Sequence, residues 1–456
     1  MNYTSHNPYT EKTFFSRNTD NVDVAFGKLD TLFQGFRKNS DEELTKRQVW
    51  IRKLADILDQ KSDELSLIMT QEMGKPVSQS RSELKKCASL CRFYAENAPS
   101  FLETETRQQS SDRYTEVRYE PLGVVLSIMP WNFPFWQVFR CAVPALMAGN
   151  SVLLKHAPNV PQCSEAICEV MYEAGVPRSR FDAIYSDNET ISKLIADSRI
   201  AAMTLTGSTR AGKAVGEVAG RNLKPIVLEL GGSDPYLILS DADCELAVEK
   251  CVTSRMLNNG QSCIAAKRFL VLDDIYDAFL EKFTAKMKSY EMGNPEENET
   301  NLGPLARKDL RDTLHEQVTK SIDKGATPLL GCELPKGPGF FYPASILTDV
   351  KPGMPAFDEE LFGPVAAIIR VQDENEAVQL ANKTVYGLGS GIFTRDLEKA
   401  KNLASKLEAG NVFINDFVKS DPEIPFGGIK QSGVGRELGR EGIQEFVNIK
   451  TVSIAY

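Results

Sequence analysis

Histidine is scarce in this chain of 456 residues, which contains only His6, His156 and His315. None of the three has a Cys, Asp or Glu at a metal-ligand spacing on a helix or hairpin. Zinc sites and Ser-His-Asp triads both depend on suitably placed histidine. The sequence therefore predicts no metal site and no histidine-based triad.

Basic charge is also in deficit, because 62 acidic residues outnumber 53 Lys and Arg and leave a net charge of -9. No basic run is present, and binding to phosphate backbones requires clustered Lys and Arg. We expect small molecules or other proteins as partners, and no nucleic acid. The nine cysteines show no paired short spacing and no secretory signal begins the chain, so we expect a reducing compartment, the cytoplasm.

Uncharged stretches are short, with the exception of the segment from Leu122 to Phe139. Pro130, Asn132 and Gln137 lie near its centre, and a lipid-facing helix could not satisfy their polar groups and interrupted backbone. We therefore interpret this segment as a buried strand, a tight turn and a core-facing helix, and we expect no contact with a membrane.

What is present is the pattern of a globular α/β protein with two or three domains, at 42% apolar and 25% charged residues. A helix is predicted after Ser40, which with Glu43 forms a capping box. From Glu116 onward, apolar strands alternate with helices, which indicates parallel βαβ units with helices on both faces. The first series of predicted strands is 122–128, 151–154, 181–185, 200–206 and 225–230, and the second is 236–239, 268–272, 365–371 and 391–394. A lone strand at 444–456 is predicted to pair with residues 114–119.

The cysteine at position 263 follows the segment Asn258-Asn259-Gly260-Gln261-Ser262 and precedes a predicted strand. Gly260 can adopt a positive φ, and Asn259 and Gln261 could place amide donors beside the sulfur. A thiol between two elements can face a cleft and act as a nucleophile. The alternative is that Cys263 is one more buried apolar cysteine.

Glu229 interrupts an apolar run that reads as a buried strand and ends in Gly231 and Gly232. Glutamate is rarely buried without a partner or a purpose, and a desolvated carboxyl group with a raised pKa suits a general base. The two glycines mark a domain boundary, so Glu229 and Cys263 would lie on opposite sides of an interdomain cleft.

Two further stretches carry possible binding groups. The Thr206 to Gly212 segment, at a strand-to-helix turn, could hold a pyrophosphate at a helix N-terminus, although it lacks the GxGxxG fingerprint and could be an ordinary βα turn. The Pro130 to Pro134 turn could present Asn132 to an oxyanion, or Asn132 could cap its own turn.

Taken in order along the chain, these stretches resemble the aldehyde dehydrogenase family. Further matches are Glu360-Leu361-Phe362-Gly363-Pro364 and Pro425-Phe426-Gly427-Gly428. The resemblance implies an α/β fold with an atypical Rossmann cofactor domain, a catalytic domain and a small bridging sheet. It implies a cofactor domain at 1–230, rejoined by 425–443, a catalytic domain at 231–424, a bridging segment at 113–120 and an oligomerisation strand at 444–456, in a homodimer or homotetramer.

The resemblance also implies roles for individual residues. Cys263 would be the nucleophile, Glu229 the base, and Asn132 with the Cys263 backbone N–H the oxyanion hole. The cofactor, NAD or NADP, would contact Met129, Pro130, Trp131, Lys155, Pro158, Gly207, Ser208, Glu360 and Phe362. Pro158 stands where many NAD-preferring relatives have an acidic residue that repels a 2′-phosphate, so we expect both cofactors to be used.

Within the family the chain is most similar to bacterial succinate-semialdehyde dehydrogenases. The alternative substrates are another ω-semialdehyde or a broad range of aliphatic aldehydes. The alternative class is a non-catalytic relative that binds a dinucleotide. It departs from some of them at Leu257, where they carry a substrate-binding arginine, and at Ala265, where they carry a second cysteine. Arg140 has no carboxylate at helical spacing, so it needs an anion from elsewhere. That anion is either an acidic side chain across the domain interface or the substrate carboxylate, with Arg255 and Ser420 as further groups of the clamp.

Overall fold

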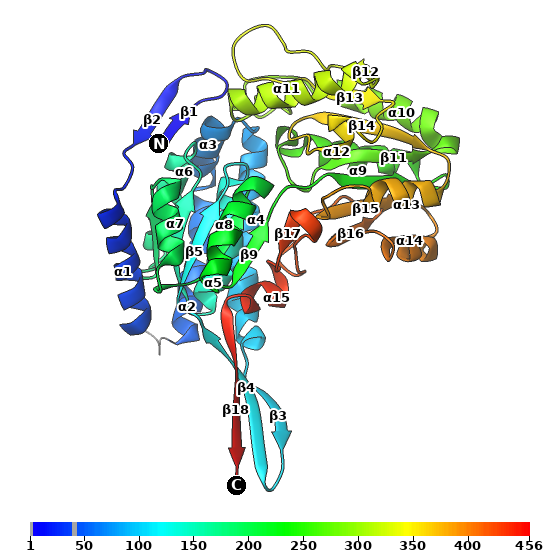
Figure 1. Ribbon diagram of the computed structural model, residues 1–456. Helices are drawn as coiled ribbons and strands as arrows, with labels where there is room; N and C mark the ends of the chain where they lie inside the picture. Colours follow the sequence, from blue (N-terminus) through cyan, green and yellow to red (C-terminus); the bar gives the residue numbers. More distant parts are fainter. Residues whose placement is uncertain (1–2, 39–42) are drawn as a thin grey trace.

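The computed structural model describes residues 3–38 and 43–456 and contains three larger sheets and one small hairpin (Figure 1). A six-stranded and a seven-stranded sheet form two lobes, and a three-stranded sheet projects from them. The α/β fold class predicted from the sequence is confirmed.

The six-stranded sheet has the order β17-β9-β8-β5-β6-β7, and its strands are parallel except for β17. Val124 and Leu126 of β5 pack with helices α1, α7 and α8, whereas Val125 packs with the α2 to α6 layer. This alternation follows from the twofold period of a strand. The strands are β5 (Val124–Met129), β6 (Ser151–His156), β7 (Phe181–Ile184), β8 (Ile200–Thr206), β9 (Ile226–Glu229) and β17 (Gly433–Val434).

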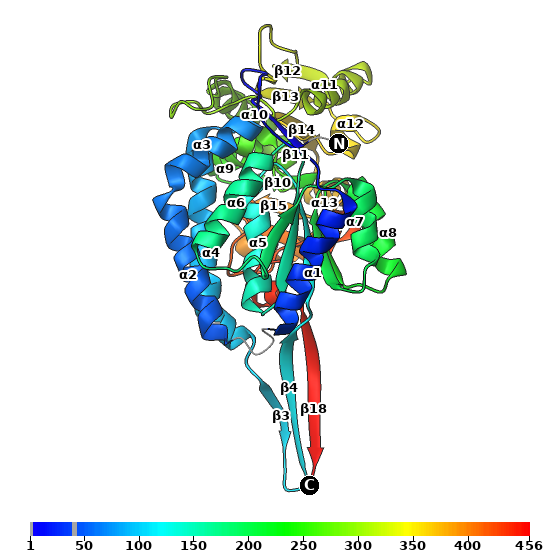
Figure 2. The same ribbon diagram turned by 90° about the vertical axis from the view of Figure 1, so that its left-hand side faces the viewer.

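The helices of this lobe cover both faces of its sheet (Figures 1 and 2). The Leu122 to Phe139 segment forms β5, a turn and the fully buried start of α5, as predicted. In the described part of the chain, no helix combines the length and the apolar character needed to cross a membrane. The helices are α1 (Val22–Lys38), α2 (Leu44–Gln60), α3 (Ser62–Met73), α4 (Val77–Phe101), α5 (Pro134–Met147), α6 (Pro161–Glu173), α7 (Asn188–Ala196), α8 (Thr209–Arg221) and α15 (Gly439–Gln444).

The seven-stranded sheet has the order β12-β13-β14-β11-β10-β15-β16, with only β12 antiparallel to its neighbour. All four strands predicted in this series are present. Its strands are β10 (Asp234–Ile238), β11 (Ala266–Leu272), β12 (Thr327–Leu330), β13 (Ser345–Thr348), β14 (Val365–Val371), β15 (Gly389–Phe393) and β16 (Asn411–Ile414). Its helices are α9 (Cys244–Met256), α10 (Asp273–Lys288), α11 (Lys308–Asp323), α12 (Pro355–Asp358), α13 (Glu374–Asn382) and α14 (Leu397–Ala404), with short 3-10 turns at 257–260 and 430–432.

The third sheet forms an arm that extends away from both lobes (Figures 1 and 2). Its order is β18-β4-β3, from β3 (Glu105–Gln109), β4 (Arg113–Pro121) and β18 (Val447–Ala455). The predicted pairing of the C-terminal strand is confirmed, because β18 aligns antiparallel with β4 from Val447 opposite Pro121 to Ala455 opposite Arg113.

Residues 3–38 form a hairpin and a helix, for which the sequence pattern predicts no element. They form the hairpin of β1 (Tyr3–His6) and β2 (Thr13–Arg17), followed by α1. The hairpin touches both lobes, since the Thr4 N–H donates to the Pro158 carbonyl at 2.9 Å and the Phe340 N–H donates to the Pro8 carbonyl at 2.9 Å. Ser40 of the predicted capping box lies outside the described residues, and Glu43 is the N-cap of α2 without a side-chain bond.

Candidate active site

A left-handed turn carries Cys263. Helix α9 ends at Met256, and Asn258, Asn259 and Gly260 all have positive φ, at 58°, 56° and 74°. A Cβ on Gly260 would lie 2.3 Å from the Gly363 carbonyl carbon, so only glycine fits this approach. The predicted positive φ of Gly260 is confirmed, and the turn directs Cys263 toward the space between the lobes.

The amides of Asn259 and Gln261 hold this turn instead of facing the sulfur. Asn259 Nδ2 donates to the carbonyls of Gly74 and Pro304, both at 3.0 Å. Gln261 Nε2 donates to the Asn258 carbonyl at 3.3 Å, and its Oε1 accepts from the Ala306 N–H at 2.9 Å. The prediction that they serve as donors beside the thiol is therefore wrong, because the backbone groups around the turn already occupy them.

Lys267 contacts the turn of residues 258–263, the nucleophile turn, and is 1% exposed. Its Nζ donates to the carbonyls of Cys263 at 2.7 Å and Ser262 at 3.0 Å, and it lies 3.6 Å from Glu360 Oε1. Burial lowers the pKa of Lys267, while the Glu360 carboxylate opposes that shift. One ammonium group thus ties the Cys263 backbone to the Glu360 side chain.

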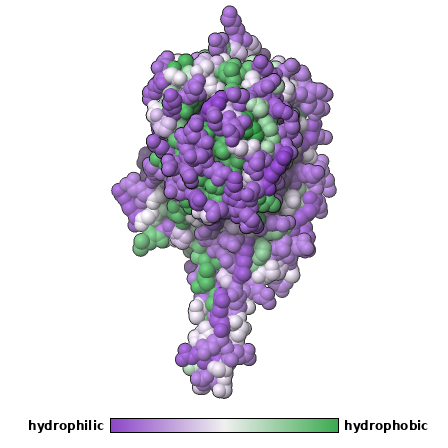
Figure 3. All heavy atoms as spheres, turned by 90° about the vertical axis from the view of Figure 1, so that its right-hand side faces the viewer, coloured by the Kyte–Doolittle hydropathy of each residue, from purple (hydrophilic) through white to green (hydrophobic). Residues whose placement is uncertain are grey.

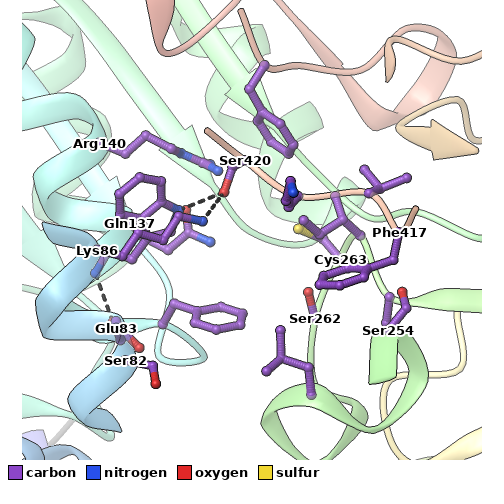
Figure 4. Close-up of a pocket in the computed structure, with 18 of the residues that line it drawn as sticks. Ser82, Glu83, Lys86, Gln137, Arg140, Ser254, Ser262, Cys263, Phe417 and Ser420 are labelled. Atoms are coloured by element: carbon purple, nitrogen blue, oxygen red, sulfur yellow. Dashed lines mark hydrogen bonds between the residues drawn. The ribbon is translucent and has the colours of Figure 1, made fainter. Parts of the chain in front are cut away.

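Cys263 lines two separate cavities, one of about 140 Å³ and one of about 230 Å³. The smaller cavity has a mainly apolar wall, and Figure 4 shows Lys86, Gln137, Arg140 and Ser420 gathered across it from the thiol. Its apolar residues are Phe133, Trp136, Leu257, Ile264, Phe417, Val418 and Phe426. The thiol therefore lies where a molecule in either cavity can reach it.

The larger cavity collects six of the nine residues that the family resemblance assigned to the cofactor. They are Pro130, Trp131, Gly207, Ser208, Glu360 and Phe362. The buried Thr206 hydroxyl in its wall has no hydrogen-bond partner among the described residues. Helix α8 begins beside it, with Ser208 as N-cap, which favours an anion. These residues fit a dinucleotide, and the start of α8 would favour its pyrophosphate.

Met129, Lys155 and Pro158 lie at or beyond the carboxyl ends of β5 and β6, outside the lining of both cavities beside Cys263. This sheet edge is where ligands of doubly wound α/β folds bind. Burial lowers the pKa of Lys155 to about 8. The three residues therefore share one sheet edge with each other but not with Cys263.

Asn132 lies against the nucleophile turn. Its Nδ2 donates to the Gln261 carbonyl at 3.1 Å, and its own carbonyl accepts from Asn258 Nδ2 at 2.8 Å. Asn132 also lines the larger cavity with Cys263. An amide fixed in this way can meet a developing oxyanion without rearranging the backbone.

Glu229, at the end of β9, is 1% exposed, and neither of its carboxyl oxygens has a hydrogen-bond partner within the described ranges. Burial raises the pKa of Glu229 well above its usual value, Glu437 adds to this, and the Arg140 charge opposes it. Burial likewise raises the pKa of Cys263 to about 12, with the charges of Arg140 and Lys267 opposing it. Burial thus favours the protonated form of both groups, so each has to lose its proton before it acts as nucleophile or base.

Arg140 is 2% exposed, and its guanidinium forms an ion pair with Glu437. The predicted alternatives for its anion were an acidic side chain across the domain interface and the substrate carboxylate. The partner is an acidic side chain, but Glu437 belongs to the 425–443 segment, which was assigned to the same domain as Arg140. Because Arg140 already has an anionic partner, the lack of a carboxylate near it in the sequence is no longer a reason to expect that it binds the substrate. Arg140 still lines the smaller cavity.

The two other groups of the predicted clamp differ in their placement. Arg255 is fully buried outside the lining of the cavity, and its Nη2 donates to the Gly260 carbonyl at 2.5 Å, so its predicted contact with substrate is wrong. It stabilises the nucleophile turn instead. Ser420 lines the cavity, and its Oγ accepts from Lys86 Nζ at 2.8 Å and from Trp136 Nε1 at 3.1 Å.

Sequence reasoning missed Lys86, Lys267 and Glu437. Lys86 belongs to an ordinary helical pattern with Lys85 beside it, so nothing local distinguishes it. Lys267 offered a signal, because it opens the apolar run of β11, where a charge is unexpected.

No group of three or more candidate metal ligands occurs in the described parts of the chain.

A single thiol is shared by two cavities and lies between a doubly wound sheet and a second α/β sheet. The chain belongs to the aldehyde dehydrogenase family, whose model matches residues 2–452. The predicted family is thereby confirmed.

The chain is also similar to individual proteins of this family. The chain is 48% identical over 418 residues to the succinate semialdehyde dehydrogenase (NAD(P)+) Sad of Escherichia coli strain K12, covering 92% of this chain and 90% of the relative. It is 45% identical to succinate-semialdehyde dehydrogenase (NADP(+)) 1 of Mycobacterium ulcerans, covering 97% of each. The solved succinic semialdehyde dehydrogenase of Streptococcus pyogenes, in complex with NADP+, superposes with a TM-score of 0.97 at 35% identity over the full length of both chains.

Proposed function

We propose that the protein oxidises succinate semialdehyde to succinate, with NAD or NADP as the hydride acceptor. The observation that carries the substrate is the smaller cavity, where an apolar wall leads from Cys263 to the cationic groups Lys86 and Arg140. An aldehyde with a carboxylate a few carbons away matches both ends of this cavity. The names of the similar proteins support the same substrate.

The residues act in sequence on one carbon. The Cys263 sulfur, deprotonated, forms a bond to the aldehyde carbon, and the carbonyl electrons move onto oxygen, where Asn132 Nδ2 and the Cys263 N–H donate. The chemistry that NAD(P) supplies when bound is acceptance of the hydride, which leaves a thioester on Cys263. Glu229 removes a proton from water, the water oxygen bonds to the acyl carbon, and the carbon–sulfur bond breaks to release the carboxylate and Cys263.

A panel of aldehydes tests the substrate. Succinate semialdehyde, the C5 semialdehyde and butyraldehyde would be compared by kcat/KM, each with NAD and with NADP. We expect succinate semialdehyde to be the best substrate. Equal rates with butyraldehyde would instead assign a broad aliphatic aldehyde dehydrogenase, and the absence of any reduced cofactor would assign a non-catalytic dinucleotide-binding relative.

Pro158 leads to a prediction about cofactor choice. Pro158→Glu is expected to weaken NADP at least tenfold and to spare NAD. A carboxylate ~4 Å from a 2′-phosphate costs about 4 kcal/mol at an effective dielectric of ~20, and solvent at this half-buried site reduces that figure. The measurement is the KM or Kd for each cofactor, and Pro158→Gln is the neutral control. Equal weakening of both cofactors by Pro158→Glu would contradict the account.

The arm supports self-association, as a homodimer or homotetramer. Its β18 pairs with β4 on one side only, and its exposed apolar residues include Ile449, Ile454 and Tyr456. Figure 3 shows hydrophobic residues along one side of the arm, below a mostly hydrophilic lobe. An unpaired edge with apolar side chains favours a further strand or sheet. Deleting residues 447–456 should lower the mass measured by sedimentation, and an unchanged mass would contradict this role.

A reducing compartment, the cytoplasm, is part of the same proposal. All nine cysteines are free, and seven of them are buried. Cys263 must also stay reduced to act as a nucleophile. These observations support a compartment in which thiols persist.

A further inference from the structure

Lys86 is the cation of the smaller cavity that has no carboxylate partner. It projects from α4 toward the cavity, where its Nζ donates to Ser420 Oγ at 2.8 Å and lies 4.0 Å from the centre of the Trp136 ring (Figure 4). Within the described ranges, no ion pair joins Lys86 to an acidic side chain.

The nearest carboxyl group on its own helix is already engaged. Glu83 forms an ion pair with the buried Lys75, and its Oε1 accepts from the backbone N–H groups of Phe135 and Trp136 at 2.9 and 2.8 Å. Glu83 therefore caps the start of α5 and neutralises Lys75. Its carboxyl oxygens are engaged by these groups, and Glu83 forms no ion pair with Lys86 in the described structure.

The second cation of this wall is neutralised in another way, because Arg140 pairs with Glu437. Lys419, the third cation of the lining, pairs with Asp416 at 3.0 Å. Among the described residues, Lys86 is therefore the one lining cation without a carboxylate partner, and such a half-buried cation favours an anionic ligand.

We propose that Lys86 is the residue that binds the substrate carboxylate, with Ser420 orienting its ammonium group. The proposal rests on the proposed function and assigns the specificity for an acidic aldehyde to a lysine. Leu257, in the same cavity, supplies no charge. Lys86 therefore decides between succinate semialdehyde and its neutral analogue.

The charge of Lys86 should depend on pH within the working range of the enzyme. Burial lowers its pKa to about 8, and the Arg140 charge on α5 adds to this, while Cys87 and Glu83 on α4 and Asp421 in the loop after β16 oppose it. The free enzyme then loses this positive charge as pH rises through 8. The substrate carboxylate stays ionised throughout, since its pKa lies near 4.

The central experiment compares Lys86→Met with Lys85→Met, because Lys85 is the exposed neighbour on the same helix. We expect Lys86→Met to lower kcat/KM for succinate semialdehyde at least tenfold, mainly through KM, and to change kcat/KM for butyraldehyde less than twofold. Lys85→Met should match the wild type with both aldehydes. Arg140→Ala is a poorer probe, because it leaves the buried Glu437 without its cation and should impair both reactions.

A second measurement needs no variant. The ratio of kcat/KM for succinate semialdehyde to that for butyraldehyde cancels the titration of Cys263 and Glu229, which act on both aldehydes. In the wild type this ratio should fall as pH rises from 7 to 9, because Lys86 loses its proton, and in Lys86→Met it should be flat.

The outcomes separate the two proposals. A wild type that prefers butyraldehyde overturns the proposed substrate, whatever Lys86 does. The role of Lys86 is overturned if the wild type prefers succinate semialdehyde and Lys86→Met keeps this preference. It is also overturned if Lys86→Met loses activity toward both aldehydes equally. A wild-type ratio that does not change with pH overturns it as well, even if the variant fails to fold.

Discussion

Cys263→Ala is expected to abolish both the first burst of reduced cofactor and steady turnover, by a factor of about 10⁴ or more. Among the described residues, no other cysteine lines either cavity, so no second thiol can replace it. The turn that holds Cys263 is fixed by Asn259, Gln261 and Lys267, and none of these contacts uses the sulfur. The variant should therefore fold normally and still bind cofactor.

Stopped-flow mixing with aldehyde and NADP measures the burst, and fluorescence titration measures cofactor binding. Cys244→Ala is the matched control, because Cys244 is partly exposed and lies outside both cavities. It should keep full activity. A Cys263→Ala enzyme with normal turnover would contradict the covalent mechanism.

Glu229→Gln is expected to keep the burst but to lower steady turnover about 10²- to 10³-fold, since general base catalysis contributes roughly that much. The glutamine has the shape of the protonated glutamic acid and cannot take a proton from water. Formation of the thioester needs no such step from Glu229, so the burst amplitude should stay near one per active site. Loss of the burst together with turnover would assign Glu229 to the activation of Cys263 instead.

The stability of the same variant provides a check through the pKa of Glu229. Burial raises this pKa in the folded state, so the folded protein binds the proton more tightly than the unfolded chain does. This carboxyl group therefore lowers the stability progressively as pH rises above its unfolded value near 4. Glutamine removes that cost, so the melting temperature of Glu229→Gln at pH 7 should equal or exceed that of the wild type.

The alternation of strands and helices was predictable because strands buried on both faces are continuous apolar runs. β8 spans the predicted residues 200–206 for this reason, and the uncharged run from Leu122 resolved into β5 and α5. The segment around Cys263 was also predictable, since the Asn-Gly pair and a cysteine before a strand are local signals. The family resemblance then supplied roles that periodicity alone could not.

Contacts between distant parts of the chain were not predictable in the same way. Arg140 needed an anion on local grounds, but nothing near it in the sequence identifies Glu437. Asn259 and Gln261 looked free to face the sulfur because the carbonyl of Pro304 and the N–H of Ala306 enter only through folding. Lys86 and Lys85 are alike in sequence, and only the packing of α4 against α5 distinguishes them.

The bond network of Lys267 has a consequence for protein engineering. Because this one ammonium group holds the carbonyls of Ser262 and Cys263 and lies 3.6 Å from Glu360, a substitution of Glu360 leaves a buried positive charge in contact with the nucleophile backbone. Substitutions of Glu360 that are meant to change cofactor use will therefore also change the position and the electrostatic environment of the Cys263 thiol. Redesign of cofactor use is better begun at Pro158. Its carbonyl accepts a hydrogen bond from the Thr4 N–H of the N-terminal hairpin, and its backbone makes no hydrogen bond to Cys263 in the described structure.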